Sequence, residues 1–197
     1  PDAFIAISKE VRSRISKYYG RESEVVYPPV EIPNLKLQIP NKFEIQKPEI
    51  QNYYFLIVSR LVPYKKIDLT IKVFNKLKLP LKIIGIGSQM RRLKAMAKSN
   101  IEFLGNLTDK DLVRYYSECR ALVFPGLEDF GLTILEAQSF GKPVIAFKKG
   151  GALETVIDPS TGSGSATGLF FDKQSVESLI AAIKQFNNLA ISPRDCM

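Results

Sequence analysis

The sequence predicts an α/β fold in which helices cover both faces of a parallel sheet, an arrangement described as doubly wound. Short apolar runs alternate with longer segments whose apolar residues recur every three or four positions, as strands and helices do. Strands that are joined through helices make right-handed crossovers, which give parallel sheets. With 197 residues and 45% hydrophobic composition, the chain can also bury one sizeable core.

The predicted strands are short and apolar enough to be buried on both faces of such a sheet. They are Tyr54–Ser59, Leu81–Ile84, Ile101–Leu104, Ala121–Phe124, Pro143–Phe147 and Leu169–Phe171. The predicted helices follow apolar residues at helical spacing. Three of them are an apolar stripe from Leu69 to Leu77, the segment Gln89–Lys98 and a helix that begins at the cap formed by Thr108 and Asp111. The other three are Gly131–Phe140, Leu153–Val156 and a closing helix from Val176 to Ile183.

The chain divides into unequal parts. Residues 1–30 carry their own pattern, a strand at Phe4–Ile7 followed by a helix that Ser8 caps and Gly20 ends. Residues 31–52 hold three prolines and show poor periodicity, so we expect an irregular connector. The α/β pattern fills residues 53–190, with a mobile loop at Pro159–Thr167, and residues 191–197 are expected to form a tail.

Composition narrows the classes of function. Histidine is absent, which removes imidazole bases and histidine-bound metals. Only Cys119 and Cys196 are present, too few and too far apart in sequence for a disulfide framework or a metal cluster, so we expect a reducing, cytoplasmic setting and a buried, inert thiol at Cys119. No apolar run reaches about 18 residues, which argues against a membrane-spanning helix.

The net charge of +8, from 28 basic and 20 acidic residues, favours anionic partners. The lysines are mostly scattered and no basic and aromatic RNA-reading motif is present, so nucleic acid is not expected. We interpret the excess as solubility together with attraction to an acidic membrane face.

The stretch Phe124–Phe140 combines the features of a ligand site. A strand ends at Pro125-Gly126, an acidic loop follows, and a helix begins near Gly131. Glu128 in the loop and Glu136 in the helix are eight residues apart and can accept hydroxyl protons. Between them, the first-turn amides at Phe130, Gly131 and Leu132 suit a phosphate. A nucleotide sugar has this chemistry; the alternative is a surface loop acid beside a solvated helix acid.

This stretch resembles the E-x7-E motif of retaining GT-B glycosyltransferases (glycosyltransferase family 4, group 1). The surrounding Glu-Asp-Phe-Gly-Leu-Thr-Ile-Leu-Glu-Ala is similar to that of many bacterial and archaeal mannosyltransferases. The resemblance implies the Rossmann-like, C-terminal half of a GT-B fold, preceded in residues 1–30 by the end of an N-terminal domain that is mostly missing. It also implies that Glu128 contacts the hydroxyls of the transferred sugar and that Glu136 contacts the ribose.

Two cations follow the first predicted sheet strand. Arg60 offers a bidentate fork and Lys65 a compact charge, and both can converge on a diphosphate. In the resembled family this Arg and this Lys stabilise the departing nucleoside diphosphate. The alternative is a pair of solvated cations beside a helix start; Lys66 is expected at the surface.

Four further positions are weaker candidates for donor binding. Gly85 and Gly87 follow the second strand, where glycine permits either close approach to a ligand or a tight turn. Leu107 corresponds to a residue near the nucleotide base in the family. Glu154, after Gly150-Gly151, matches an acid beside the donor pocket, or is simply a first-turn helix acid.

The resemblance implies transfer of a sugar from a nucleotide-diphosphate sugar with retention of configuration. No cofactor or metal is required, and the motif variants favour GDP-mannose over UDP-sugars. The acceptor, a glycan or lipid-linked molecule, would contact the missing N-terminal domain, so we expect this chain alone to bind donor without efficient transfer. We expect the protein in the cytoplasm or peripherally at the inner membrane face. The alternative is a non-catalytic nucleotide-binding or subunit-docking module of the same fold.

Overall fold

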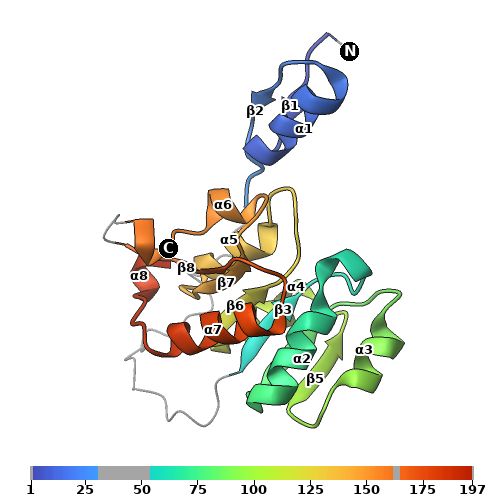
Figure 1. Cartoon of the computed structure of the whole chain (residues 1–197), viewed down its shortest axis with the longest axis vertical. Helices are drawn as coiled ribbons and strands as arrows, with labels where there is room; N and C mark the ends of the chain where they lie inside the picture. Colours follow the sequence, from blue (N-terminus) through green and yellow to red (C-terminus); the bar gives the residue numbers. More distant parts are fainter. Residues whose placement is uncertain (1, 31–53, 162–164, 197) are drawn as a thin grey trace.

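The computed structural model describes residues 2–30, 54–161 and 165–196, and a parallel sheet forms its centre (Figure 1). Within these ranges the sheet has six strands in the order β5-β4-β3-β6-β7-β8, and each neighbouring pair is parallel. The strands are β3 (Phe55–Val58), β4 (Leu81–Ile84), β5 (Ile101–Gly105), β6 (Ala121–Phe124), β7 (Val144–Phe147) and β8 (Gly168–Phe171). Each agrees with its predicted strand to within one residue at either end, and the predicted fold class is confirmed.

The strand order changes direction once, beside the first strand of the sheet. From β3, the strands β4 and β5 extend the sheet one way, and β6, β7 and β8 extend it the other way. This is the order of a Rossmann-type doubly wound sheet, in which ligands bind outside the carboxyl ends of the strands where the order reverses. The segments that follow β3 and β6 therefore meet at the expected place for a ligand site.

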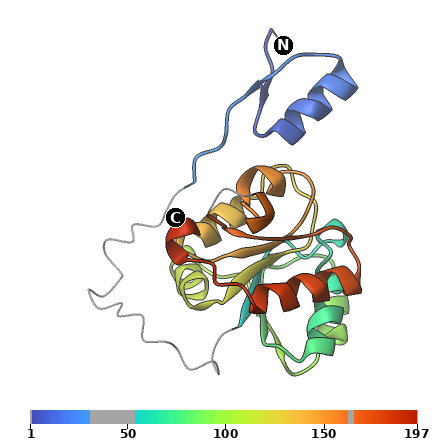
Figure 2. The same ribbon diagram turned by 60° about the vertical axis from the view of Figure 1, so that its left-hand side comes forward.

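Helices cover both faces of the sheet (Figure 2). Strand side chains alternate between the faces, so Phe55 and Ile57 of β3 enter one core while Leu56 enters the other. The first core is covered by α2 (Ile67–Leu77), α3 (Met90–Met96) and α7 (Val176–Asn187). The second is covered by α4 (Asp109–Glu118), α5 (Leu132–Ser139) and α6 (Ala152–Thr155).

Residues 2–30 form a small unit outside the sheet, beyond α6 (Figure 1). It contains β1 (Ile5–Ala6), α1 (Lys9–Tyr19) and β2 (Glu24–Val25), and β1 pairs with β2 in parallel. The Ser8 hydroxyl caps α1 by accepting a hydrogen bond from the Val11 amide, and the left-handed Gly20 ends the helix, as predicted. Helix α1, described over its whole length, has no buried residue. The helix therefore adds no fully buried residue to a hydrophobic core.

Two predicted segments differ from the structure, and a third lies outside it. Helix α8 (Pro193–Cys196) occupies the predicted tail and packs near Gly141, with Cys196 buried. Thr167, which was predicted to end a mobile loop, is buried, and its hydroxyl bonds Gln138 and the Ile157 amide. The predicted connector at 31–52 lies outside the described residues.

The thiol at Cys119 is buried, as predicted. Burial raises its pKa to about 12, which keeps it protonated and unreactive at neutral pH. Among the helices in the described ranges, none is long and apolar enough to cross a bilayer.

Candidate functional site

A pocket of about 580 Å³ opens where the segments after β3 and β6 meet. Its walls come from three parts of the chain that are distant in sequence: the segment after β3, the motif segment after β6, and the unit of residues 2–30. The lining residues are Ile7, Glu10, Arg14, Val58, Ser59, Arg60, Tyr64, Lys65, Leu127, Glu128, Asp129, Phe130, Gly131, Leu132 and Thr133. Six of the eleven predicted site residues are therefore brought together here, namely Arg60, Lys65, Glu128, Phe130, Gly131 and Leu132.

Lys65 is a buried cation in the wall of the pocket. It ends the 3-10 turn η3 (Pro63–Lys65), and its ammonium forms an ion pair with Glu128. Burial, and then the neighbouring charge of Arg60, lower the pKa of Lys65 to about 8, while Asp129 opposes the shift. A charged ammonium at this place can form a charge-assisted hydrogen bond with an anion such as a phosphate.

Arg60 is exposed at the rim of the pocket, and its guanidinium donates to the Tyr64 hydroxyl at 3.1 Å. The loop that carries it rests directly on two glycines. A Cβ atom on Gly85 would lie 1.9 Å from the Ser59 carbonyl oxygen, and one on Gly87 would lie 2.4 Å from the Leu61 carbonyl oxygen. Gly85 and Gly87 are outside the pocket lining, and the structure shows them in the turn that supports the Arg60 loop. Their contact with a ligand stays a prediction.

Glu128 lies half-buried in the loop between β6 and α5. A hydrogen bond from the segment before α6 fixes the backbone of this loop: the Gly151 amide donates to the Glu128 carbonyl oxygen at 2.9 Å. Helix α5 then begins after Gly131, whose φ of 89° brings the chain sharply into the helix. Its first residues line the pocket, so the free amides of this turn are available to a bound anion.

Glu136 lies one turn further along α5 and outside the pocket lining. Its carboxylate accepts a hydrogen bond from the Tyr116 hydroxyl at 2.6 Å. Burial and then the charge of Glu136 raise the pKa of Tyr116, so the phenol stays a donor. Leu107 packs against the second core rather than into the pocket. Both donor-binding assignments stay predictions.

Glu154 is engaged by residues 2–30. Its carboxylate accepts hydrogen bonds from the Lys9 amide at 3.0 Å, from the Glu10 amide at 3.2 Å and from the Tyr27 hydroxyl at 3.0 Å. The hydrogen bond to Glu154 is the main reason that the pKa of Tyr27 is raised. The predicted contact of Glu154 with a donor remains a prediction, and the structure adds this second set of partners.

The sequence reasoning missed several pocket residues. Arg14 of α1 forms an ion pair with Asp129 across 115 positions of the chain. Asp129 is next to Glu128 in the motif, and this position could have identified it as a pocket residue. Arg14 gave none, because it lies on an exposed helix with several other cations.

A second pair of acidic residues, which could in principle bind a metal ion, lies in helix α4. Asp109 and Asp111 form an Asp-x-Asp pair in the first turn of α4, where Asp111 bonds the Thr108 hydroxyl at 2.7 Å. Neither aspartate lines the pocket. Across the described ranges, no group of three or more Cys, Asp and Glu residues is arranged to hold a metal ion. The requirement for a metal stays a matter of prediction.

The pocket thus combines cations and carboxylates at one crevice, beside free helix amides. The cations can bind a diphosphate, and the carboxylates can accept protons from sugar hydroxyls. A family model described as "Glycosyl transferases group 1" matches residues 38–196. The chain belongs to this family. The match confirms the family that the E-x7-E motif suggested.

Curated relatives agree with this family. An uncharacterised glycosyltransferase of Methanocaldococcus jannaschii is 29% identical over 82% of this chain and 44% of its own length. A GDP-mannose-dependent monoacylated α-(1-6)-phosphatidylinositol monomannoside mannosyltransferase of Corynebacterium glutamicum is 37% identical over 53% of this chain and 31% of its own length. The chain thus spans less than half the length of these two relatives.

Solved structures share the fold. Sucrose-phosphate synthase from Thermosynechococcus elongatus superposes with a TM-score of 0.77 at 24% identity, covering 99% of this chain and 50% of its own. TarM from S. aureus, in a complex that contains UDP, superposes with a TM-score of 0.73 at 21% identity, covering 95% of this chain and 37% of its own. The sheet of this family member is therefore of the Rossmann-like, GT-B type.

Proposed function

We propose that this chain is the donor-binding part of a retaining glycosyltransferase that uses a nucleotide-diphosphate sugar. The observation that carries the proposal is the buried Lys65, paired with Glu128 beside the free amides of α5. A donor molecule offers each of these side chains a new partner, the diphosphate for Lys65 and the sugar hydroxyls for Glu128. The unliganded ion pair keeps both groups in place until the donor separates them.

The proposed chemistry relies on electrostatics. When the bond between the sugar and the diphosphate breaks, negative charge develops on the leaving phosphate. Lys65, Arg60 and the first-turn amides of α5 would stabilise this charge more in the transition state than in the bound donor, which lowers the barrier. Glu128 would orient the sugar, and Glu136 would anchor the ribose. We infer that no metal or other cofactor is needed, because these groups already supply positive charge.

GDP-mannose is the proposed donor. The C. glutamicum relative depends on GDP-mannose and acts on a phosphatidylinositol mannoside, which supports both a mannosyl donor and a lipid-linked or glycan acceptor. A mannosyltransferase of Mycolicibacterium smegmatis, 24% identical over 82% of this chain, also depends on GDP-mannose. The acceptor would contact an N-terminal domain, so the separate chain is proposed to bind donor without efficient transfer.

Calorimetric titration with GDP, GDP-mannose, UDP and UDP-glucose, with and without magnesium, tests the donor. We expect metal-independent binding that favours the guanine nucleotides. A preference for the UDP species would leave the proposed glycosyltransferase activity in place but contradict GDP-mannose as the donor. Absence of binding by all four would contradict the proposed donor site in this chain and favour the alternative of a docking module.

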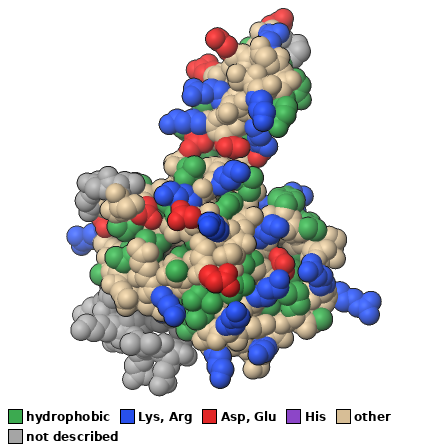
Figure 3. All heavy atoms as spheres, viewed as in Figure 1, with side chains coloured by type: hydrophobic (Ala, Val, Ile, Leu, Met, Phe, Trp, Pro, Cys, Tyr) green, Lys and Arg blue, Asp and Glu red, His purple; other side chains and the backbone are tan. Residues whose placement is uncertain are grey.

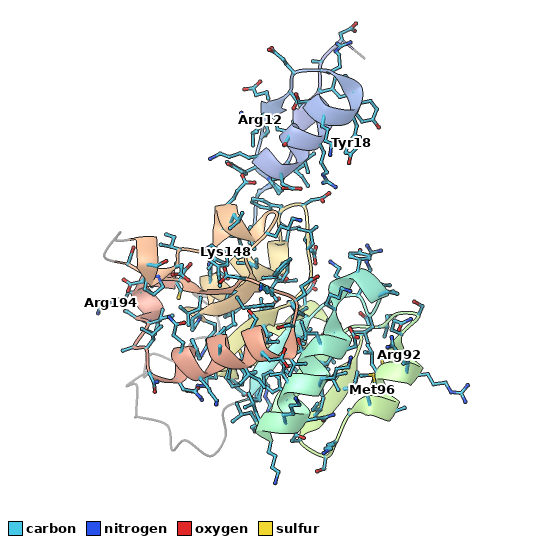
Figure 4. The ribbon with its side chains drawn as sticks, viewed as in Figure 1. Arg12, Tyr18, Arg92, Met96, Lys148 and Arg194 are labelled. Carbon is cyan, nitrogen blue, oxygen red and sulfur yellow. The ribbon has the colours of Figure 1, made fainter. Side chains whose placement is uncertain are left out.

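We also propose that the protein associates peripherally with an acidic membrane face, in the cytoplasm, where a lipid-linked acceptor would be found. Residues 54–105 contain eleven Lys and Arg residues and only two acidic ones. Basic side chains gather over α2 and α3 (Figure 3), and Arg92 lies on the outer side of α3 (Figure 4). Exposed examples are Lys72, Lys76, Arg91 and Lys94. Each cation near an anionic surface contributes about 1 kcal/mol.

Vesicle co-sedimentation tests this surface. Reversing two of its charges, by Lys72→Glu with Arg91→Glu, should weaken binding to vesicles that contain phosphatidylserine by at least about tenfold. The matched control, Lys110→Glu with Arg194→Glu, changes the net charge equally on other elements. Equal loss in both variants would contradict a defined membrane face.

A further inference from the structure

Glu154 joins two parts of the chain that are far apart in sequence. Within the described residues its carboxylate accepts three hydrogen bonds, all from residues 2–30: two from the amides of Lys9 and Glu10, and one from the hydroxyl of Tyr27. The nearest of these donors in sequence is 127 positions away. Helix α6, which carries Glu154, belongs to the sheet domain, so the contact connects this domain to the N-terminal unit.

The contact has a clear chemical basis. The first amides of a helix have no acceptor within the helix and carry partial positive charge, so a carboxylate at this point is favourable. The Ser8 hydroxyl accepts from the Val11 amide, and Glu154 accepts from the two amides that precede it. Because α1 has no buried residue, these bonds and the Arg14–Asp129 ion pair are its main contacts with the sheet domain.

The same contact reaches the wall of the pocket. The Tyr27 ring, held at its hydroxyl by Glu154, stacks on Phe130 with 5.6 Å between ring centroids. One helical turn beyond Glu10, Arg14 pairs with Asp129. Phe130 and Asp129 directly follow Glu128 in the motif, and all three line the pocket. Docking of α1 therefore brings part of the N-terminal unit against the segment that carries Glu128, which is proposed to orient the sugar.

We propose that Glu154 is a positioning residue that docks residues 2–30 onto the sheet domain and thereby completes the pocket wall. It acts on the ligand through α1 and Tyr27 and does not touch the donor itself. The docking role stands on the contacts alone, whereas its effect on ligand affinity rests on the proposed nucleotide-sugar site. Two measurements separate these parts.

The first measurement is amide hydrogen exchange by NMR in the full chain. In Glu154→Gln the side chain loses its charge and one of its two acceptor oxygens, so the Lys9 and Glu10 amides should exchange about tenfold faster. The Val11 amide, which donates to Ser8, is the internal reference and should change less. Glu177→Gln, which alters a first-turn acid of α7, is the matched control and should leave α1 unchanged. Unchanged exchange at Lys9 and Glu10 in Glu154→Gln would overturn the docking role.

The second measurement is a double-mutant cycle on GDP affinity with Glu154→Gln and Tyr27→Phe. The Tyr27 variant keeps the ring on Phe130 and removes only the hydroxyl. If Glu154 acts through Tyr27 and α1, both single variants weaken GDP binding. The double variant should then bind GDP about as weakly as Glu154→Gln alone, so the effects are strongly non-additive. If both single variants weaken GDP binding and their effects simply add in the double variant, Glu154 and Tyr27 act independently on the nucleotide, and the positioning role is overturned. Failure of the wild-type chain to bind GDP would count against the proposed function, and hydrogen exchange would still decide the docking role.

Discussion

Nucleotide binding is expected to weaken as the pH rises past 8, because the buried Lys65 loses its charge there. Burial and the neighbouring Arg60 lower the pKa of this ammonium to about 8. At pH 9 only about one molecule in eleven carries a charged Lys65, whereas about ten in eleven do at pH 7. A bound diphosphate selects the charged form, so the apparent affinity follows the charged fraction. We therefore expect the dissociation constant of GDP to rise about tenfold between pH 7 and pH 9.

The matched variant is Lys65→Arg, whose guanidinium stays charged throughout this range. Calorimetric titration of both proteins at several pH values and constant ionic strength gives the ratio of their affinities. This ratio cancels ionisation of the nucleotide, which both proteins share. A ratio that does not change with pH would refute the assignment of Lys65 as the phosphate-binding cation.

Other predictions concern the ribose contact and the support of the site. Glu136→Ala should weaken nucleotide binding about tenfold or more, because a charged hydrogen bond is lost, whereas Lys110→Ala should not; equal calorimetric affinities would contradict the ribose assignment. Gly85→Ala should lower the free energy of unfolding by about 3 kcal/mol or more, since its Cβ would meet the Ser59 carbonyl at 1.9 Å and its φ is 128°. Gly105→Ala, with a φ of 73° and no atom within 4 Å of its Cβ, should cost only about 1 kcal/mol, and urea unfolding compares the two.

The sheet could be predicted from the sequence because its signals are local. Each strand is a short apolar run, and each crossover contains a helix with an apolar stripe, so the parallel arrangement follows from general rules. The small errors lie at element ends, for example at β1, where the predicted Phe4–Ile7 shortens to Ile5–Ala6. Helix α8 was missed because four residues carry too little periodicity to be recognised.

The centre of the pocket was also predictable, because the sheet geometry brings strand ends together. Lys65 and Glu128 are 63 positions apart, yet they follow the two strands at which the order reverses, and they form an ion pair. The predicted parallel sheet places both residues at the same edge, while the pairing of β3 with β6, which brings them together, was found only in the structure. The glycines after β4 were recognised as a turn or a ligand approach, and the structure shows the turn.

The contacts of the N-terminal unit could not be predicted from the sequence. Arg14 lies on a helix without an apolar face in the core, and its partner Asp129 follows β6 in another part of the chain. Glu154 was placed near the pocket by its motif, but its partners are two backbone amides and a tyrosine hydroxyl. Every residue except proline has a backbone amide, so the sequence does not single out these donors, and only the structure identifies the bonds.

The most direct test of the account is GDP titration of Lys65→Met against the wild-type chain. Methionine fills the buried site and removes the charge, while Lys66→Met removes an exposed cation next to it and serves as the control. Thermal unfolding establishes that both variants remain folded. We predict at least a tenfold weaker affinity for Lys65→Met and little change for Lys66→Met. Equal GDP affinity in Lys65→Met and the wild type would contradict the claim that this pocket binds the nucleotide diphosphate.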